Sequence, residues 1–225
     1  MEQYHVDLAK VSLGEFRRIL EAGTLLPSER ILGERMDERF AILESAGIAN
    51  LQDLDDRLGT KKKLAQFAEE SGMPEKYLVV LRRRAGTYAP KPVPLNKFPG
   101  VDQAHVERLG AVGVKHSEHL FARARLKHER AELAAQVNVP EDALLELVKL
   151  SDLVRAPYVG PVYARIIYET GVDRVSKLAE QRPEVLFEKA LAVNREQQLT
   201  RASFTLKDVE ACIETAKSLP KVIEY

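Results

Sequence analysis

The chain has 225 residues, and its 34 lysines and arginines are balanced by 34 aspartates and glutamates, so the formal net charge is zero. Apolar residues make up 45% and charged residues 30%, a composition that excludes a disordered or fibrous chain. The single cysteine, Cys212, excludes a disulfide framework and a cysteine-rich zinc site. No stretch reaches the roughly 18 to 20 apolar residues of a membrane span, and residues 1–10 lack the pattern of a signal peptide. We therefore expect a cytoplasmic protein without membrane contact, metal or cofactor.

Helical patterns follow one another along the chain. Ser12 and Glu15 have the spacing of an N-terminal capping box, with apolar residues at helical intervals behind them. Near the other end, Thr205 can cap a helix whose apolar face includes Val209 and Cys212. Alternating strand patterns bounded by hairpin dipeptides do not occur. The sequence predicts an all-α, multi-helical fold in which Cys212 is buried and inert.

Three segments of the chain resemble one another. A glycine followed by an apolar residue recurs at offsets of 66 and 58 residues, as Gly47-Ile48, Gly113-Val114 and Gly171-Val172. Such a glycine suits the left-handed residue that ends a helix. A Pro-Glu pair that suits a helix start follows each glycine, at Pro74, Pro140 and Pro183, but in the third segment it comes after 12 residues and not 27. The sequence thus predicts three degenerate tandem repeats, the last one shortened.

The clearest boundary lies in residues 88–95, where Pro90, Pro92 and Pro94 favour an extended connector over a helix. We expect an N-terminal helical domain over residues 1–87 with the first repeat. A C-terminal domain over residues 96–225 would hold the second and third repeats. The segment 143–154 reads as a continuous amphipathic helix, so these two repeats are expected to share a core.

The start of the third repeat resembles the helix-hairpin-helix motif of DNA repair and recombination proteins, whose hairpin usually reads Gly-apolar-Gly. Here Tyr158 stands at the first glycine position and Gly160 at the second, before Pro161 opens a helix. In the second repeat Asp102 takes the second glycine position, and the first repeat retains neither glycine around Arg35 and Met36.

In that motif, backbone N–H groups at a turn and a helix N-terminus bind a phosphate. The resemblance implies sequence-independent contact with a DNA or RNA backbone through a set of main-chain donors and one nearby cation: Val159, Gly160, Val162, Tyr163 and Arg155. The alternative is that the hairpin only turns the chain between two packed helices.

Residues 61–130 carry 15 basic and 7 acidic side chains, so positive charge gathers in the middle of the chain. The first candidates for a basic face are three arginines at a predicted helix end, Arg82, Arg83 and Arg84. If the helix that contains His116 and His119 is unbroken, three further cations share one stripe with these histidines: Arg123, Lys127 and Arg130. Alternatively, these cations serve only to complement helix C-termini or to keep the surface solvated.

Catalysis has little support, because the chain has no nucleophile elbow, no phosphate-binding glycine loop and no zinc-ligand spacing. We expect a non-enzymatic binding protein. A helical scaffold that binds a protein partner or self-associates is the alternative to nucleic-acid binding, with the apolar segment 143–154 as its surface if part of that segment is exposed.

Over its length the chain is similar to a bacterial family described as domain of unknown function 4332. The matching stretches lie in both halves: Tyr4 to Leu8, Leu25 to Arg30, Tyr77-Leu78 with Leu81 to Arg83, Lys91-Pro92, Phe98 to Gly100, and Ser151 to Leu153 through Val159-Gly160. The resemblance implies a helical protein with helix-hairpin-helix-like units. It implies no activity, substrate or partner.

Overall fold

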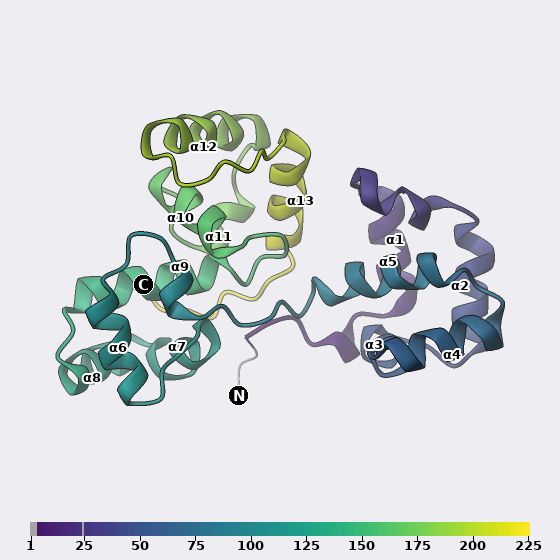
Figure 1. Ribbon diagram of the computed structural model, residues 1–225, viewed down its shortest axis with the longest axis horizontal. Coiled ribbons are helices and arrows are strands. Elements are labelled where there is room, and N and C mark those ends of the chain that lie inside the picture. Colours follow the sequence, from purple (N-terminus) through teal and green to yellow (C-terminus); the bar gives the residue numbers. More distant parts are fainter. Residues whose placement is uncertain (1–3, 24) are drawn as a thin grey trace. The chain divides into compact units, whose positions relative to one another are not determined.

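The computed structural model describes residues 4–23 and 25–225, and its regular structure there is helical (Figure 1). Within this part of the chain, extended pairing is limited to two isolated bridges, between Ser12 and Asn50 and between Pro94 and His116. The predicted all-α class is confirmed. Among the helices that the structure describes, none combines the length and the apolar character needed to cross a membrane.

The chain forms two compact units. Residues Val6–Ala89 make up the N-terminal unit, and Pro90–Tyr225 make up the C-terminal unit, with which Tyr4 and His5 also cluster. The sequence analysis assigned those two residues to the N-terminal domain. The difference arises because the Tyr4 hydroxyl lies 2.7 Å from the Ser117 hydroxyl and its ring packs edge-on against Phe121.

The N-terminal unit contains one hydrophobic core, to which aromatic rings from distant segments contribute. Phe16, Phe40, Phe67, Tyr77 and Tyr88 are all buried in it. Its elements are η1 (Leu8–Lys10), α1 (Leu13–Ala22), η2 (Pro27–Gly33), α2 (Met36–Ser45), α3 (Leu51–Leu58), α4 (Lys61–Ser71) and α5 (Glu75–Gly86). The α1 helix begins as predicted, because the Ser12 hydroxyl accepts the Glu15 N–H at 3.1 Å.

The C-terminal unit is built around α9. Its elements are η3 (Leu95–Lys97), α6 (Gln103–Ala111), α7 (Ser117–Ala124), α8 (Lys127–Val137), α9 (Glu141–Leu153), α10 (Pro161–Glu169), α11 (Val175–Ala179), α12 (Pro183–Gln197) and α13 (Leu206–Ala216). The α9 helix packs against α7 and α8 on one side and against α10 and α11 on the other. Its Leu144, Leu147, Leu150 and Leu153 are at most 2% exposed. Segment 143–154 is therefore core, as expected, and offers no exposed leucine stripe.

The helix bounds keep the offsets found in the sequence. Helices α3 and α4 correspond to α7 and α8 with both ends shifted by 66 residues, and α6 corresponds to α10 with both ends shifted by 58. The glycines that follow α2, α6 and α10 all have left-handed backbones, with φ of 81° at Gly47, 86° at Gly113 and 90° at Gly171. The predicted glycine caps are confirmed, and the shared bounds support the interpretation of tandem repeats.

The third group of helices is not shortened in the way the sequence suggested. Pro183 opens α12, which comes directly after α11, as α8 comes after α7. Pro74 and Pro140 instead precede α5 and α9, the fourth helices of their groups. The α13 helix packs against α11 and α12, as α9 packs against α7 and α8. The third group thus has four helices, with a longer loop, residues 198–205, before the last one.

A short bridge fixes the second helix in each of the first two groups. The Leu51 N–H donates to the Val11 carbonyl at 3.0 Å, and the Ser117 N–H donates to the Val93 carbonyl at 2.8 Å. At the matching place in the third group, the Val175 N–H donates to the Asp152 carboxylate at 3.0 Å. A side chain of α9 thus replaces the extended backbone segment of the other two groups.

The same carboxylate forms a buried ion pair that connects several segments. The Arg155 guanidinium is 1% exposed and pairs with Asp152. It also donates to the Tyr4 carbonyl at 2.8 Å and to the Pro220 carbonyl at 2.9 Å. The Tyr225 hydroxyl donates to Asp152 at 2.8 Å. The ion pair therefore joins α9, α11 and residues from both ends of the described chain. Because its guanidinium is buried, the predicted contact of Arg155 with nucleic acid is wrong.

We expect Asp152→Ala to lower the free energy of unfolding by about 3 to 5 kcal/mol, because it leaves a buried guanidinium without its counter-charge. Urea denaturation followed by circular dichroism measures this loss. The matched control is Glu214→Ala, which removes one carboxylate of the exposed pair between Glu214 and Lys217 and is expected to cost less than about 0.5 kcal/mol. Equal losses of unfolding free energy in the two variants would show that the buried ion pair contributes no more to stability than the exposed one.

Candidate functional site

The turn between α9 and α10 has a left-handed residue in the same place as the turn before α6. Tyr158 is left-handed, with φ of 69°, at the position where the motif usually has its first glycine. Gly100 is left-handed at the matching place before α6, with φ of 77°. In both hairpins a valine follows this residue and a helix begins two residues later. The two turns are therefore alike in conformation, although only one of them retains glycine at the second position.

Not every predicted main-chain donor of this hairpin is available. Val159 is 4% exposed, and its N–H donates to the Ala156 carbonyl at 3.1 Å, so it cannot also bind a ligand. Gly160 is exposed and is the N-cap of α10. In the first turn of an α-helix the N–H groups have no acceptor within the helix, and in α10 these include those of Val162 and Tyr163. The donors that fit are Gly160, Val162 and Tyr163, without Val159.

The start of α10 has space and positive potential for an anion. Its first turn carries no acidic residue, and no side chain of the described chain caps it. A Cβ atom built on Gly160 meets nothing within 4 Å. The helix dipole places partial positive charge at these N–H groups. A phosphate could approach them directly.

The corresponding hairpin before α6 is closed to such a ligand. The Asp102 carboxylate accepts the Ala104 N–H at 2.8 Å and so takes the place that a phosphate would occupy. The Arg165 guanidinium covers the turn, since its Nε donates to the Pro99 carbonyl at 2.7 Å. Of the two helix starts that follow a turn of this kind, only that of α10 lacks a side-chain cap, and its N-cap residue Gly160 is exposed.

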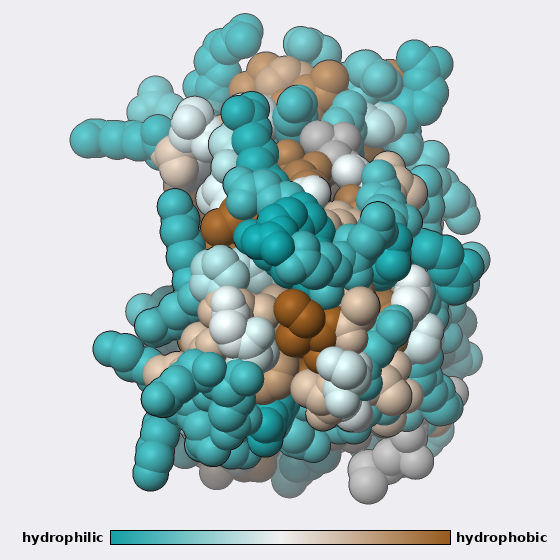
Figure 2. Space-filling view, turned by 90° about the vertical axis from the view of Figure 1, so that its right-hand side faces the viewer, coloured by the Kyte–Doolittle hydropathy of each residue, from teal (hydrophilic) through white to brown (hydrophobic). Residues whose placement is uncertain are grey.

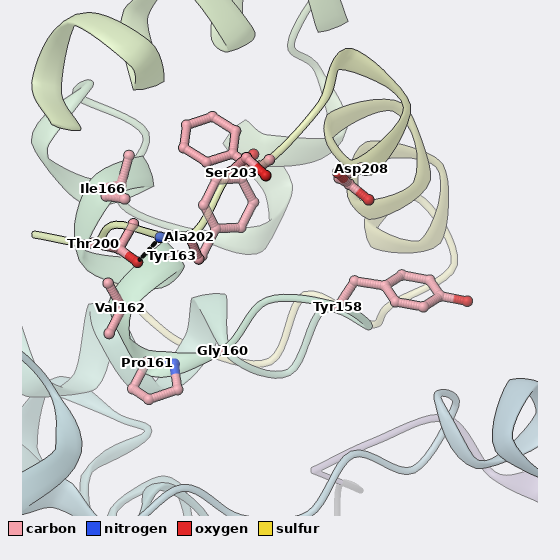
Figure 3. A pocket seen from close by; sticks show the side chains of 11 residues that line it. Tyr158, Gly160, Pro161, Val162, Tyr163, Ile166, Thr200, Ala202, Ser203 and Asp208 are labelled. Carbon is pink, nitrogen blue, oxygen red and sulfur yellow. Dashed lines mark hydrogen bonds between the residues drawn. The ribbon is translucent and has the colours of Figure 1, made fainter. Parts of the chain in front are cut away.

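A pocket of about 530 Å³ opens beside this hairpin (Figure 3). Residues 160–163 and Ile166 of α10 form one wall, and the loop after α12 forms the other, with Thr200, Ala202, Ser203 and Phe204. Tyr158 and Asp208 also line the pocket. The volume lies in the range of small-ligand sites, whose linings are mainly apolar with a few polar groups. The pocket and the helix start share Gly160, Val162 and Tyr163.

The loop that forms the second wall is held firmly at both ends. The Asn194 side chain accepts the Thr200 N–H at 3.0 Å and donates to the Thr200 carbonyl at 3.1 Å. At the other end, Thr205 and Asp208 form a capping box at the start of α13. Between them the Phe204 ring lies 5.2 Å from that of Tyr163. The sequence analysis missed this wall, because nothing in the loop's composition indicates that it folds back over α10.

Two groups at or beside the pocket, Cys212 and Tyr163, are kept protonated by burial. Burial raises the pKa of Cys212 to about 12, and its thiol donates to the Val209 carbonyl at 3.2 Å. Burial also raises the pKa of the Tyr163 hydroxyl well above its usual range. Both groups stay protonated at neutral pH, so neither is prepared as a nucleophile or base. The predicted burial of Cys212 is confirmed.

Two further arginines of the predicted basic face are buried. Arg84 is 6% exposed and lies 3.9 Å from the Glu29 carboxylate. Arg130 is also 6% exposed, and its guanidinium donates to the carbonyls of Ala124, Arg125 and Glu224. These guanidinium groups satisfy backbone oxygens and a carboxylate inside the protein. The prediction that they contact nucleic acid is wrong for both.

The remaining predicted cations are divided between the two units. Arg82 and Arg83 lie in the N-terminal unit, where Arg83 donates to Ser28 at 3.3 Å. Arg123 and Lys127 are exposed, but α7 ends before α8 begins at Lys127, so the expected unbroken helix is interrupted. Arg123 donates to the Gln136 side chain at 3.0 Å. Near the pocket, the exposed cations adjacent to lining residues are Arg201 and Lys207, which the sequence analysis did not select.

Comparison with known families identifies the C-terminal unit. The model of the family described as "Domain of unknown function (DUF4332)" matches residues 99–219, more than half of the chain. The chain belongs to this family. The match spans the helices from α6 to α13, including the hairpin and the pocket, whereas the N-terminal stretches that carried the resemblance lie outside it. Comparisons with curated proteins and with solved structures found no significant match.

Two stacked histidines cap α7 on the other side of this unit. The His116 ring lies 3.5 Å from the His119 ring, and His116 Nδ1 accepts the His119 N–H at 3.3 Å. His119 Nδ1 in turn accepts the Lys115 N–H at 3.4 Å. Burial and the neighbouring His119 lower the pKa of His116, against an opposite effect of Glu118. An acceptor nitrogen cannot carry a proton, so this cap requires neutral imidazole.

This cap predicts a pH dependence of stability. The folded protein favours neutral His116, because its pKa is lowered there. The contribution of this cap to the free energy of unfolding is therefore fully present above the unfolded-state pKa of about 6.5, and it is lost as the pH falls below that value. We expect His116→Asn to keep the cap, as Asn50 does at the matching position of α3, and to reduce the loss of stability between about pH 7 and pH 5. Thermal unfolding at both pH values measures this. The control, exposed His128→Asn, should leave the loss unchanged; an equal loss in wild type and His116→Asn would contradict the prediction.

Proposed function

We propose that this protein binds the phosphate backbone of nucleic acid, without reading base sequence, through the hairpin at Gly160. The proposal rests mainly on the uncapped start of α10, where Gly160 is exposed, a Cβ atom built on it meets nothing within 4 Å, and the first-turn N–H groups have no acceptor within the helix. Main-chain N–H groups at a helix start bind phosphate by hydrogen bonds and by the helix dipole. They contact no base edge, so the binding is sequence-independent.

The charge distribution supports weak binding. The chain has no net charge, and Arg84, Arg130 and Arg155 are used inside the protein. Few phosphates are therefore neutralised at once, and the expected dissociation constant lies near the micromolar-to-100-micromolar range of non-specific binding. Affinity falls with salt concentration, but with a shallow slope, because that slope scales with the number of phosphates contacted.

Binding without catalysis fits the surroundings of the hairpin. Two titratable groups at or beside the pocket, Cys212 and Tyr163, are held protonated by burial. The described residues contain no group of three or more His, Cys, Asp or Glu side chains that could hold a metal ion. A helical scaffold for a protein partner has less support. The large hydrophobic side chains exposed on the described chain are Val79 and Val185, and Figure 2 shows one face on which hydrophobic residues form only small areas among hydrophilic ones.

Gly160→Asp tests the hairpin. The backbone at Gly160, with φ of −80° and ψ of 172°, accepts any residue, and aspartate there would cap α10 as Asp102 caps α6. We expect unchanged or slightly higher thermal stability, together with at least about fivefold weaker binding of a fluorescent oligonucleotide at about 50 mM salt, where backbone contacts are strongest.

Gly14→Asp is the matched control. Gly14 is exposed near the start of α1 in the N-terminal unit, and a Cβ atom built on it meets nothing within 4 Å. The substitution changes the net charge by the same amount as Gly160→Asp. Its affinity should equal that of the wild type. Equal affinity in Gly160→Asp and Gly14→Asp would remove the hairpin from the binding site, and no binding by the wild type at low salt would reject the proposed function.

A further inference from the structure

The pocket beside the hairpin deepens the proposed function, on which the following inference rests. Its two walls are the start of α10 and the loop 198–205, and the first wall includes Gly160, Val162 and Tyr163, the proposed phosphate donors. A ligand bound at the helix start therefore has a cavity of about 530 Å³ directly beside it. In a nucleic acid, the group that lies beside a phosphate is a sugar and its base.

We propose that the pocket receives an unpaired base of a single-stranded nucleic acid while the start of α10 holds the adjacent phosphate. The cavity is lined by the aromatic rings of Tyr163 and Phe204 and by aliphatic Val162 and Ile166. Bases stack on such surfaces largely independently of their identity, because every base has a π-face. In a duplex the bases are stacked inside the helix and cannot enter the cavity unless they are flipped out.

The polar groups of the pocket set the orientation of the bound nucleotide. Asp208 lines the pocket from α13, and Figure 3 shows it across the pocket from Pro161 and Val162. A carboxylate repels a phosphate. The phosphate therefore belongs at the Gly160 end of the pocket, and the base belongs against the aromatic and aliphatic lining.

The aromatic wall is positioned before any ligand binds. Phe204 packs between Tyr163, at 5.2 Å, and Phe187, whose ring lies edge-on at 6.0 Å. The Asn194 hydrogen bonds to Thr200 and the capping box at Thr205 hold the loop on either side of this ring. Little ordering of the protein is then needed when a base enters, and a smaller ordering cost favours affinity.

Three labelled ligands of equal length test the pocket: a single strand, the duplex, and a single strand of abasic sugar-phosphate units. The wild type should bind the single strand about tenfold more tightly than either of the others at about 50 mM salt. DNA and RNA single strands should behave alike, because the proposed contacts involve phosphate and base faces. Equal affinity for all three ligands would overturn the base pocket.

Ala202→Trp tests the cavity without altering the helix start. Ala202 is an exposed loop residue that lines the pocket, so a tryptophan there fills the cavity with little effect on the core. We expect the affinity for the single strand to fall to about the affinity for the duplex, while the affinity for the duplex stays unchanged. The control is Ala192→Trp on the exposed side of α12, which should keep the preference.

The two proposals fail in different ways. If Gly160→Asp weakens binding of every ligand while Ala202→Trp leaves the preference for the single strand intact, the phosphate site stands and the base pocket is rejected. If the wild type binds none of the three ligands at low salt, both proposals are rejected. Thermal unfolding of each variant establishes that it is folded. Phe204→Leu, which keeps an apolar side chain and removes the ring, should reduce the preference in the same direction as Ala202→Trp.

Discussion

The buried pair of Asp152 and Arg155 determines how the C-terminal unit is held together. A carboxylate and a guanidinium removed from water are costly unless their remaining hydrogen-bonding capacity is used, and here it is. Arg155 binds the carbonyls of Tyr4 and Pro220, and Asp152 binds the Val175 N–H and the Tyr225 hydroxyl. The pair lies at the end of α9, directly before the hairpin at Tyr158. The hairpin and the start of α10 therefore follow a buried, fully hydrogen-bonded ion pair.

Helices α6 and α10 occupy matching places in their groups but differ in the residue at the N-cap. Asp102 caps α6 with its own carboxylate, and Arg165 covers the preceding turn, so that hairpin is satisfied by the protein itself. Gly160 supplies no side chain at the same place, and α10 begins uncapped. The difference between a packing hairpin and a candidate binding hairpin is thus a single N-cap residue and one covering arginine. The loop 198–205 then adds an aromatic wall that the group containing α6 lacks.

Charge counted along the chain overestimated the basic surface. Arg84, Arg130 and Arg155 each stood in a cation-rich or hairpin segment, yet all three are at most 6% exposed. Arginine can serve inside a protein because its planar group donates several hydrogen bonds to backbone carbonyls at once. Arg130 does this with three carbonyls. The count of positive residues therefore says little about ligands until their burial is known.

The sequence alone determined the all-α class, the glycine caps at Gly47, Gly113 and Gly171, the core position of segment 143–154 and the turn before Pro161. These features follow from local rules, because backbone conformation at a glycine and apolar spacing along a helix depend on near neighbours. Only the tertiary structure decided that Val159 is internally bonded, that Tyr4 joins the C-terminal unit, and that Phe204 packs against Tyr163 in the lining of a pocket. Each of these depends on contacts between residues far apart in the chain, which no local pattern specifies.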